Sequence, residues 1–405
     1  MLFLSIIINL KLYGKNRDMP LKLGNRSPKK ERTKMNRKIK ISGFQLLCMI
    51  FMFELGAPIP IEIYKRAKQD TWISLIMGLV IGCLLFYVIL KLNSFFPEIP
   101  FTKYIQHILG KYVGKVLALI YIVYFIYYAA LVLRNCEDLL VVSLYSSSSL
   151  ISIGILMVFL IMYALYKGFE TFARANEFMF FVSIFFILLF IGLEMISNII
   201  NFNNLRPVLE NGWEPVLKAT PLLVSNPFGE IFIFTMILPY LNNQKKAKIG
   251  ISSLLMYGVI VTMLSILNIS ILGVSEIERT IYPFLTSVSY INIADSIQKL
   301  DTFLVILTVY NFFIKITVYL YCAVSGSADL FGVKRSSDLI YPIAIIVLIC
   351  SLWLAPNYIE QRIKTAEIVP ILLQLPLQII IPVILLIIVL IRRKLRGKKL
   401  VSKSV

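Results

Sequence analysis

Histidine is almost missing from this chain, and this limits the kinds of catalytic and metal-binding sites that it can form. With one histidine, His107, we expect neither a histidine-based metal site nor a histidine-dependent hydrolytic triad. The five cysteines stand singly without Cys-x-x-Cys spacing, so we expect them to be small apolar packing residues. A Walker-type phosphate loop and a nucleophile elbow are also absent from the sequence. We therefore expect no enzyme, no metal site and no cofactor.

Charged residues are scarce as well. They make up 16% of the 405 residues, compared with roughly 25% in an average soluble domain. Hydrophobic residues reach 58% and the mean hydropathy is +0.81. Apolar runs of about 20 residues, long enough to cross a bilayer as a helix, recur along the chain. The composition predicts an all-α polytopic membrane protein and excludes the soluble class.

The apolar runs predict about ten transmembrane helices. Short segments rich in polar and turn residues separate them. The expected spans are 41–65, 72–92, 113–133, 150–167, 176–198, 215–241, 249–273, 299–324, 338–355 and 368–391.

Positive charge is concentrated at the two ends of the chain. Residues 1–40 hold twelve lysines and arginines with two acids, and residues 392–405 hold seven with no acid. Basic segments beside membrane spans stay in the cytoplasm and contact anionic lipid, so we place both termini there and expect no nucleic acid partner. The expected organisation is a disordered basic tail (1–40), a transmembrane transporter-fold domain (41–392) and a basic cytoplasmic tail (393–405).

Two of the expected spans are interrupted in the middle by glycine and proline. The interruptions are Gly56-Ala57-Pro58 in the first span and Asn226-Pro227-Phe228-Gly229 in the sixth. Ten spans with breaks in the first and sixth divide into two halves of five, which is typical of inverted-repeat transporters that bind substrate at the breaks. The sequence thus predicts a 5+5 inverted repeat with a small-molecule site near the bilayer midplane.

The residue types at the breaks suit ligand binding. Gly56 lets the backbone leave helical geometry and Pro58 removes a donor, so we expect carbonyls over 53–55 and amides at 56 and 57 to be free for a ligand. Asn226 is expected to bond a polar ligand directly. The alternatives are a plain proline kink at the first break and a capped helix start at the second.

Three ionisable residues lie deep within spans. Glu54, Glu230 and Lys315 are costly there and usually face a cavity or a partner, so they are candidates for ion or proton coupling. Lys315 is expected to pair with either Glu54 or Glu230, and a snorkelling lysine is the alternative. Tyr124, in an aromatic stripe on the third span, is a candidate ligand contact, with plain packing as the alternative.

Several segments resemble the spore germination permease family. They are the opening Ile41-Ser42-Gly43-Phe44-Gln45, the stretch Phe53-Glu54-Leu55-Gly56-Ala57, and Gln69-Asp70-Thr71-Trp72-Ile73-Ser74 at the start of the second span. The similarity covers roughly 40–395. Ala57 departs from the serine or threonine expected in many relatives, which bears on ligand identity.

The resemblance implies a B-type subunit of a nutrient germinant receptor in the amino acid–polyamine–organocation superfamily. Such a subunit works with an A-type membrane subunit and a C-type lipoprotein in the inner membrane of a bacterial spore. It would bind a small nutrient, often an amino acid, at the two breaks and trigger germination. The rival hypotheses are a proton-coupled amino acid transporter and a water- or ion-conducting subunit without a dedicated ligand.

Overall fold

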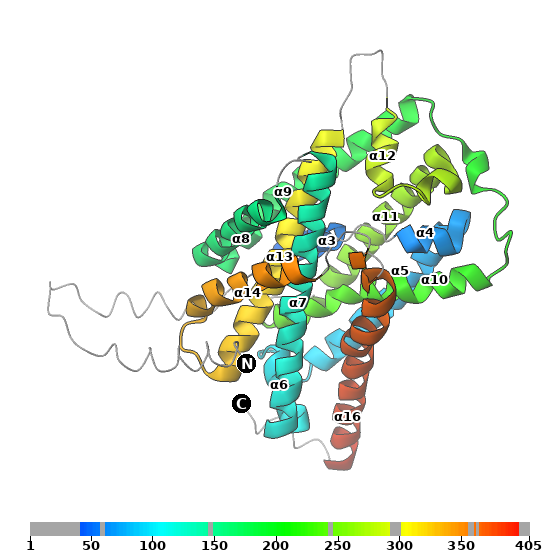
Figure 1. The fold of residues 1–405 in the computed structure, drawn as a ribbon. Helices are drawn as coiled ribbons and strands as arrows, with labels where there is room; N and C mark the ends of the chain where they lie inside the picture. The colour runs from blue at the N-terminus through cyan, green and yellow to red at the C-terminus, as the bar shows by residue number, and fades with distance from the viewer. Residues whose placement is uncertain are drawn as a thin grey trace.

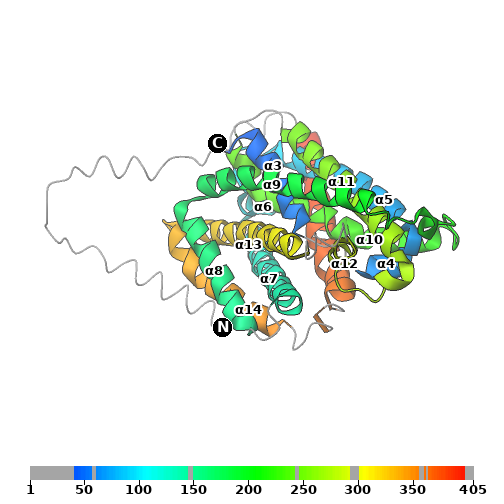
Figure 2. The same cartoon turned by 90° about the horizontal axis from the view of Figure 1, so that it is seen from above.

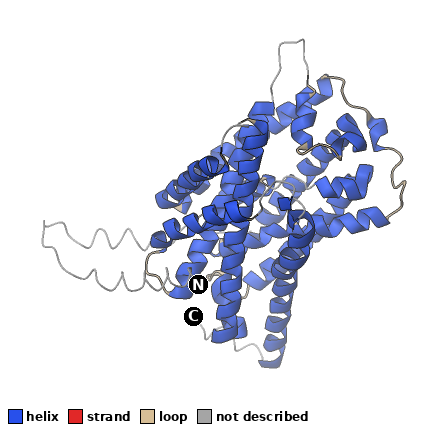
Figure 3. Cartoon of the chain, viewed as in Figure 1, coloured by secondary structure: helices blue, strands red, loops and turns tan. Residues whose placement is uncertain are grey.

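The computed structural model of the protein is mainly helical in the part of the chain that it describes (Figure 3). That part comprises residues 41–56, 61–144, 149–241, 246–291, 301–354, 360–361 and 364–396. Within these ranges no β-strand occurs, and the one isolated backbone bridge joins Ile41 to Leu241. The predicted tail over 1–40 and most of the C-terminal tail lie outside the described residues.

The longer helices follow one another along the chain with short connections. They are α3 (Gly43–Leu55), α4 (Ile61–Ala67), α5 (Thr71–Asn93), α6 (Phe101–Leu109), α7 (Lys111–Ser143), α8 (Leu150–Lys167), α9 (Phe169–Ile196), α10 (Glu214–Ser225), α11 (Lys246–Ile277), α12 (Pro283–Ser289), α13 (Asp301–Phe331), α14 (Ile340–Trp353) and α16 (Ile381–Arg396). The 3₁₀ and π segments are η1 (Lys68–Asp70), η2 (Phe202–Leu205), η3 (Phe228–Met236), η4 (Leu238–Tyr240), η5 (Ser336–Leu339), η6 (Lys364–Ile368) and η7 (Pro370–Ile380).

Eight helices of the described chain are long and apolar enough to cross a membrane. They correspond to eight of the ten expected spans, and the remaining two are the interrupted ones. The first of these stops at the end of α3 and resumes at α4, and the other stops at the end of α10 and resumes at η3. Each half is shorter than a bilayer crossing, because a span needs about 20 helical residues.

Helices α7 and α13 run side by side at the centre of the molecule (Figures 1 and 2). Helices α8 and α14 lie on one side of this pair, and α5, α10 and α11 lie on the other in both views. The central pair therefore packs against the continuous helices α8 and α14 on one side, and α13 also packs against η3 of the second broken span.

Three features differ from the sequence expectation. The connections that follow the expected spans 72–92 and 249–273 contain the short helices α6 and α12. The last span begins with a π-helical stretch, η7, that carries Pro376. A π-helix widens the turn to i→i+5 bonding and is frequent at functional sites, and hydrophobicity alone gives no signal for it.

Candidate functional site

The first break ends α3 in a closed turn. The Gly56 amide donates to the carbonyl of Met52 at 3.3 Å and of Phe53 at 3.1 Å, so the expectation of a free amide at Gly56 was wrong. The tight last turn of a helix satisfies such groups internally. A Cβ added at Gly56 would lie 2.8 Å from the carbonyl oxygen of Asn311, which shows how closely α3 ends against α13. Ala57 and Pro58 lie outside the described residues.

The second break has an extended backbone. Asn226 has φ −143° and ψ 116°, the Asn226–Pro227 peptide is cis, and η3 begins at the next residue. The Phe228 ring packs on Gly78 and Gly82 of α5, where an added Cβ would lie 3.1 Å and 2.7 Å from Phe228 atoms. Phe228 therefore fastens the inner half of the broken helix to α5.

Because Gly229 has no side chain, the second break can approach the π-helical stretch η7 closely. An added Cβ would lie 2.5 Å from the carbonyl oxygen of Val224 and 2.6 Å from Oε1 of Gln378. The amide of Gln378 donates to the hydroxyl of Tyr124 at 2.7 Å. Tyr124 is thus hydrogen-bonded to η7, which packs against the second break at Gly229.

A cavity of about 240 Å³ adjoins the two breaks. Its walls come from α7, α9, α11 and α13, and residues around α12 close one end. Of the residues that the sequence singled out, Gly56, Asn226, Glu230 and Lys315 line this cavity. The others that the structure describes are set around it, outside the lining: Glu54, Tyr124, Pro227, Phe228 and Gly229.

A buried ion pair lies at the inner end of the cavity. The ammonium of Lys315 lies 2.5 Å from Oε2 of Glu230, and both side chains are almost fully buried. The Tyr319 hydroxyl donates to the same carboxylate oxygen at 3.3 Å. Lys315 also lies over the ring of Phe53, 4.8 Å from its centroid. The structure thus selects Glu230, rather than Glu54, as the partner of Lys315.

Unpartnered polar atoms gather around this ion pair. The described residues give no hydrogen-bond partner to the amide oxygens of Asn226 and Asn311 or to the hydroxyls of Tyr128 and Tyr257, although all four atoms are buried. These residues line the cavity. Buried polar groups are normally paired, so such a set is suited to a polar ligand or bound water.

Sequence reasoning missed Asn311 and Tyr257. Both are polar residues within predicted membrane spans, and that placement was the signal that could have identified them.

Packed residues lie beyond the ion pair, on the side where α3 begins. Below the ion pair, the ring of Phe53 lies 5.2 Å from that of Phe234 and 5.4 Å from that of Tyr319. Where α3 begins and η4 ends, the Ile41 amide donates to the Tyr240 carbonyl at 3.3 Å. From the ion pair, the lining residues extend in the other direction, along α7 and α13 toward α12.

Helix α12 caps that other end through one buried hydroxyl. The Ser287 hydroxyl lies 2.9 Å from Oε1 of Glu194 on α9 and 3.0 Å from Oδ1 of Asn268 on α11. Asn268 also lines the cavity, as do residues 281–285 just before and within α12. The position of the cap is therefore coupled to the cavity wall.

Replacing Ser287 with alanine is expected to loosen this cap. The hydroxyl carries one proton, so the change leaves one buried acceptor, on Glu194 or on Asn268, without its donor, which costs about 1–3 kcal/mol. Thermal unfolding of the purified protein would measure it. Ser289→Ala is the matched control, because that hydroxyl is exposed and donates only to Thr286 of its own helix. Equal unfolding midpoints for the two variants would contradict the bonding described for Ser287.

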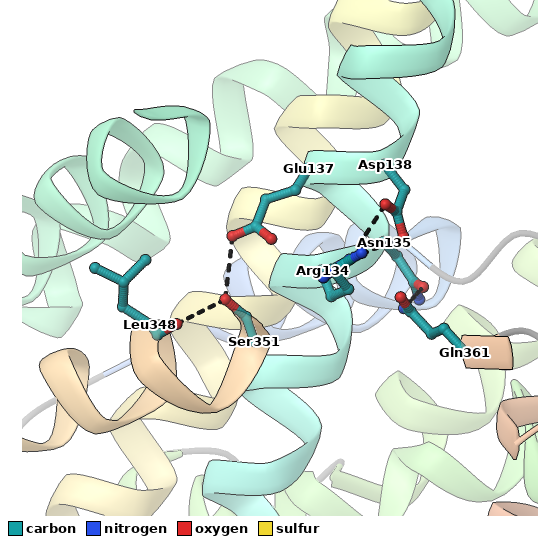
Figure 4. Close-up of polar contacts among 7 residues, drawn as sticks. All are labelled: Arg134, Asn135, Glu137, Asp138, Leu348, Ser351 and Gln361. Atoms are coloured by element: carbon teal, nitrogen blue, oxygen red, sulfur yellow. Dashed lines mark hydrogen bonds and ion pairs between the residues drawn. The ribbon is translucent and has the colours of Figure 1, made fainter. Parts of the chain in front are cut away.

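A second polar cluster occupies the C-terminal half of α7 (Figure 4). Arg134 pairs with Asp138 at 3.2 Å, and the buried carboxylate of Glu137 accepts from Ser351 of α14 at 3.1 Å. Asn135 on the same turn accepts a hydrogen bond from Gln361 at 2.8 Å, and both of these residues line the cavity. This turn of α7 thus connects the cavity wall to the outer end of α14.

Metal binding has no obvious site in the described chain. No group of three or more histidine, cysteine, aspartate or glutamate side chains there is arranged to hold a metal ion. The arrangement of breaks, ion pair and unpartnered oxygens is suited to non-covalent binding of a small polar molecule.

A family profile and individual relatives both relate this chain to spore germination proteins. The sequence profile of the family described as "Spore germination protein" matches residues 40–359. The chain is 34% identical to spore germination protein KB of Bacillus subtilis (strain 168) over 365 residues, which cover 89% of this chain and 97% of that protein. It is 25% identical to spore germination protein YndE of the same organism, over 74% of this chain and 83% of that protein.

Proposed function

Because this chain belongs to the spore germination protein family, we propose that it is the B-type, nutrient-sensing subunit of a germinant receptor. In this proposal a small nutrient, an amino acid, binds in the cavity at the broken helices and triggers germination. The observation that carries it is the set of buried, unpartnered polar atoms beside two interrupted membrane helices. Catalysis has no part in the proposal.

The proposed architecture is the 5+5 inverted repeat. Its support is the position of the two interruptions, between α3 and α4 and between α10 and η3, five spans apart. With both basic tails in the cytoplasm, the capped end of the cavity faces outward and the Ile41–Tyr240 contact closes the inward side. Ligand would then shift the balance between two such states by binding one of them better.

The proposed setting is the inner membrane of a spore, in a complex with A-type and C-type receptor subunits. Support for this setting comes from the family and from the apolar helices, which place the chain in a membrane. In a shared complex, a change in the shape of this subunit would be passed to its partners.

The test is germination of spores that carry Asn226→Leu. The change removes the buried amide of the second break while keeping a similar side-chain volume, so we expect germination to at least one nutrient class to be lost. The triggers would be a panel of amino acids and nucleosides, with the protein level measured by immunoblot. Asn203→Leu, on an exposed segment, is the matched control. Unchanged germination to every nutrient at a normal protein level would reject the cavity as the sensing site.

A proton-coupled amino acid transporter is the second candidate. The observation that favours it is the buried Lys315–Glu230 pair next to another buried carboxylate, Glu54, since such groups form proton relays in pumps and transporters. Uptake of an amino acid into proteoliposomes that depends on a proton gradient would support this candidate over the receptor.

A further inference from the structure

Glu54 is a buried carboxylate without a partner. Its side chain is 0% exposed, and neither of its oxygens has a hydrogen-bond partner within the described residues. A buried carboxylate is costly unless it is paired and hydrogen-bonded. Such a group either holds a proton in the ligand-free site or is balanced by a cationic partner that binds there.

The nearby lysine does not meet this need. Lys315 interacts electrostatically with Glu54, but its ammonium lies 2.5 Å from Glu230. The three groups thus comprise two acids and one base in one buried place. A ligand that brings one more positive charge would balance the set.

Besides Lys315, the polar atoms described here around Glu54 are oxygens. The amide oxygen of Asn311 is buried and unpartnered, and the end of α3 packs directly on this part of α13. The Tyr257 hydroxyl is also unpartnered, and Tyr257 interacts electrostatically with Glu54. Oxygen acceptors around a carboxylate are what an ammonium group, with its several N–H donors, requires.

Glu54 lies directly behind the lining of the cavity, next to residues that form its wall. The residues that directly follow Glu54, Leu55 and Gly56, line the cavity, and so do Asn311, Lys315 and Tyr257. Beyond this inner end the walls are largely aliphatic, with Leu131, Val261 and Leu264 among them.

We propose that Glu54 is the counter-ion for an ammonium group on the small molecule that occupies the cavity. The site then takes zwitterions and cations that carry an amine, with the remainder of the molecule along the aliphatic walls, and rejects anions and neutral compounds. This proposal rests on the proposed function of the cavity and adds the charge class of its ligand and the residue that selects it.

The experiment measures thermal unfolding of the full chain in lipid nanodiscs with four probes. They are an acid hydrolysate of casein, the same hydrolysate after N-acetylation, a mixture of glucose and inosine, and KCl or NaCl at equal ionic strength. We expect the hydrolysate alone to raise the unfolding midpoint. Acetylation removes the positive charge of the amines and keeps most of each molecule, so it should abolish the effect.

Glu54→Gln should weaken the response to the hydrolysate by about tenfold to a hundredfold in concentration, the usual weight of a charged hydrogen bond. Without ligand this variant should unfold at or above the wild-type midpoint, because it removes a buried unpaired charge. Glu54→Asp, which keeps the charge, should retain part of the response. Glu98→Gln, an exposed acid, should respond as the wild type does.

Three results would overturn the proposal. A shift from the acetylated hydrolysate or from glucose and inosine, equal in wild type and Glu54→Gln, would keep the ligand cavity and reject the ammonium. A shift from K⁺ or Na⁺ alone that is lost in Glu54→Gln would assign the carboxylate to an alkali ion instead. No shift from any probe would reject the small-molecule cavity together with its proposed selectivity.

Discussion

Lys315→Met is expected to destabilise the protein by about 3–5 kcal/mol, which is the typical cost of removing one partner from a buried ion pair. The lysine is 2.5 Å from Glu230, and its loss leaves Glu230 and Glu54 together without a cation in the described surroundings. Thermal unfolding of the purified variant, or its level in membranes by immunoblot, measures the effect.

Two further variants make the Lys315 result specific. Lys218→Met removes a lysine from an exposed pair with Glu214, and such pairs contribute about 0–1 kcal/mol. Lys315→Met combined with Glu230→Gln removes both members of the buried pair, so it should recover much of the lost stability. If Lys315→Met unfolded at the wild-type temperature, the buried ion pair would not exist in the folded protein.

Gly229→Ala is expected to impair both stability and ligand response. The added Cβ would lie 2.5 Å from the Val224 carbonyl and 2.6 Å from the Gln378 amide oxygen. The break and the π-helical stretch must then separate, and overpacking of this kind costs about 1–3 kcal/mol. The unfolding midpoint and the nutrient concentration for half-maximal germination would both be measured.

Gly192→Ala provides the control for the Gly229 variant. Gly192 lies within α9, and nothing lies within 4 Å of a Cβ added there. Alanine is favoured over glycine in a helix by about 0.5–1 kcal/mol, so this variant should be as stable as the wild type or more stable. Equal behaviour of the two alanine variants would show that the second break is open enough to accept a methyl group.

The two breaks could be predicted because their causes are local. Glycine and proline alter the backbone at their own positions, so the interruption of helix before Phe228 follows from Asn226, Pro227 and Gly229 alone. The long apolar helices were predictable for the same reason, since length and hydrophobicity are properties of a single segment.

The contacts of the candidate site depend on packing between distant segments. The sequence placed Lys315 deep in a span but left its partner open between two acids, and only the packing of η3 against α13 selects Glu230. Asn311 reaches the site because α13 runs past the end of α3, an arrangement that no residue near Asn311 encodes by itself. The short helix α12 was missed because its polar segment has the composition of a loop.

The backbone hydrogen bond between Ile41 and Tyr240 contributes only a small part of the free energy that must hold the proposed receptor in its inactive state. A hydrogen bond contributes about 0.5–1.5 kcal/mol, whereas reversing a 99:1 balance between two states takes about 5.5 kcal/mol. A bond of this strength is too weak by itself to keep the proposed receptor inactive when no nutrient is bound. Farther along the same two segments, the ring of Phe53 packs on those of Phe234 and Tyr319, so in the proposed receptor this aromatic packing would have to supply most of the stability of the closed state.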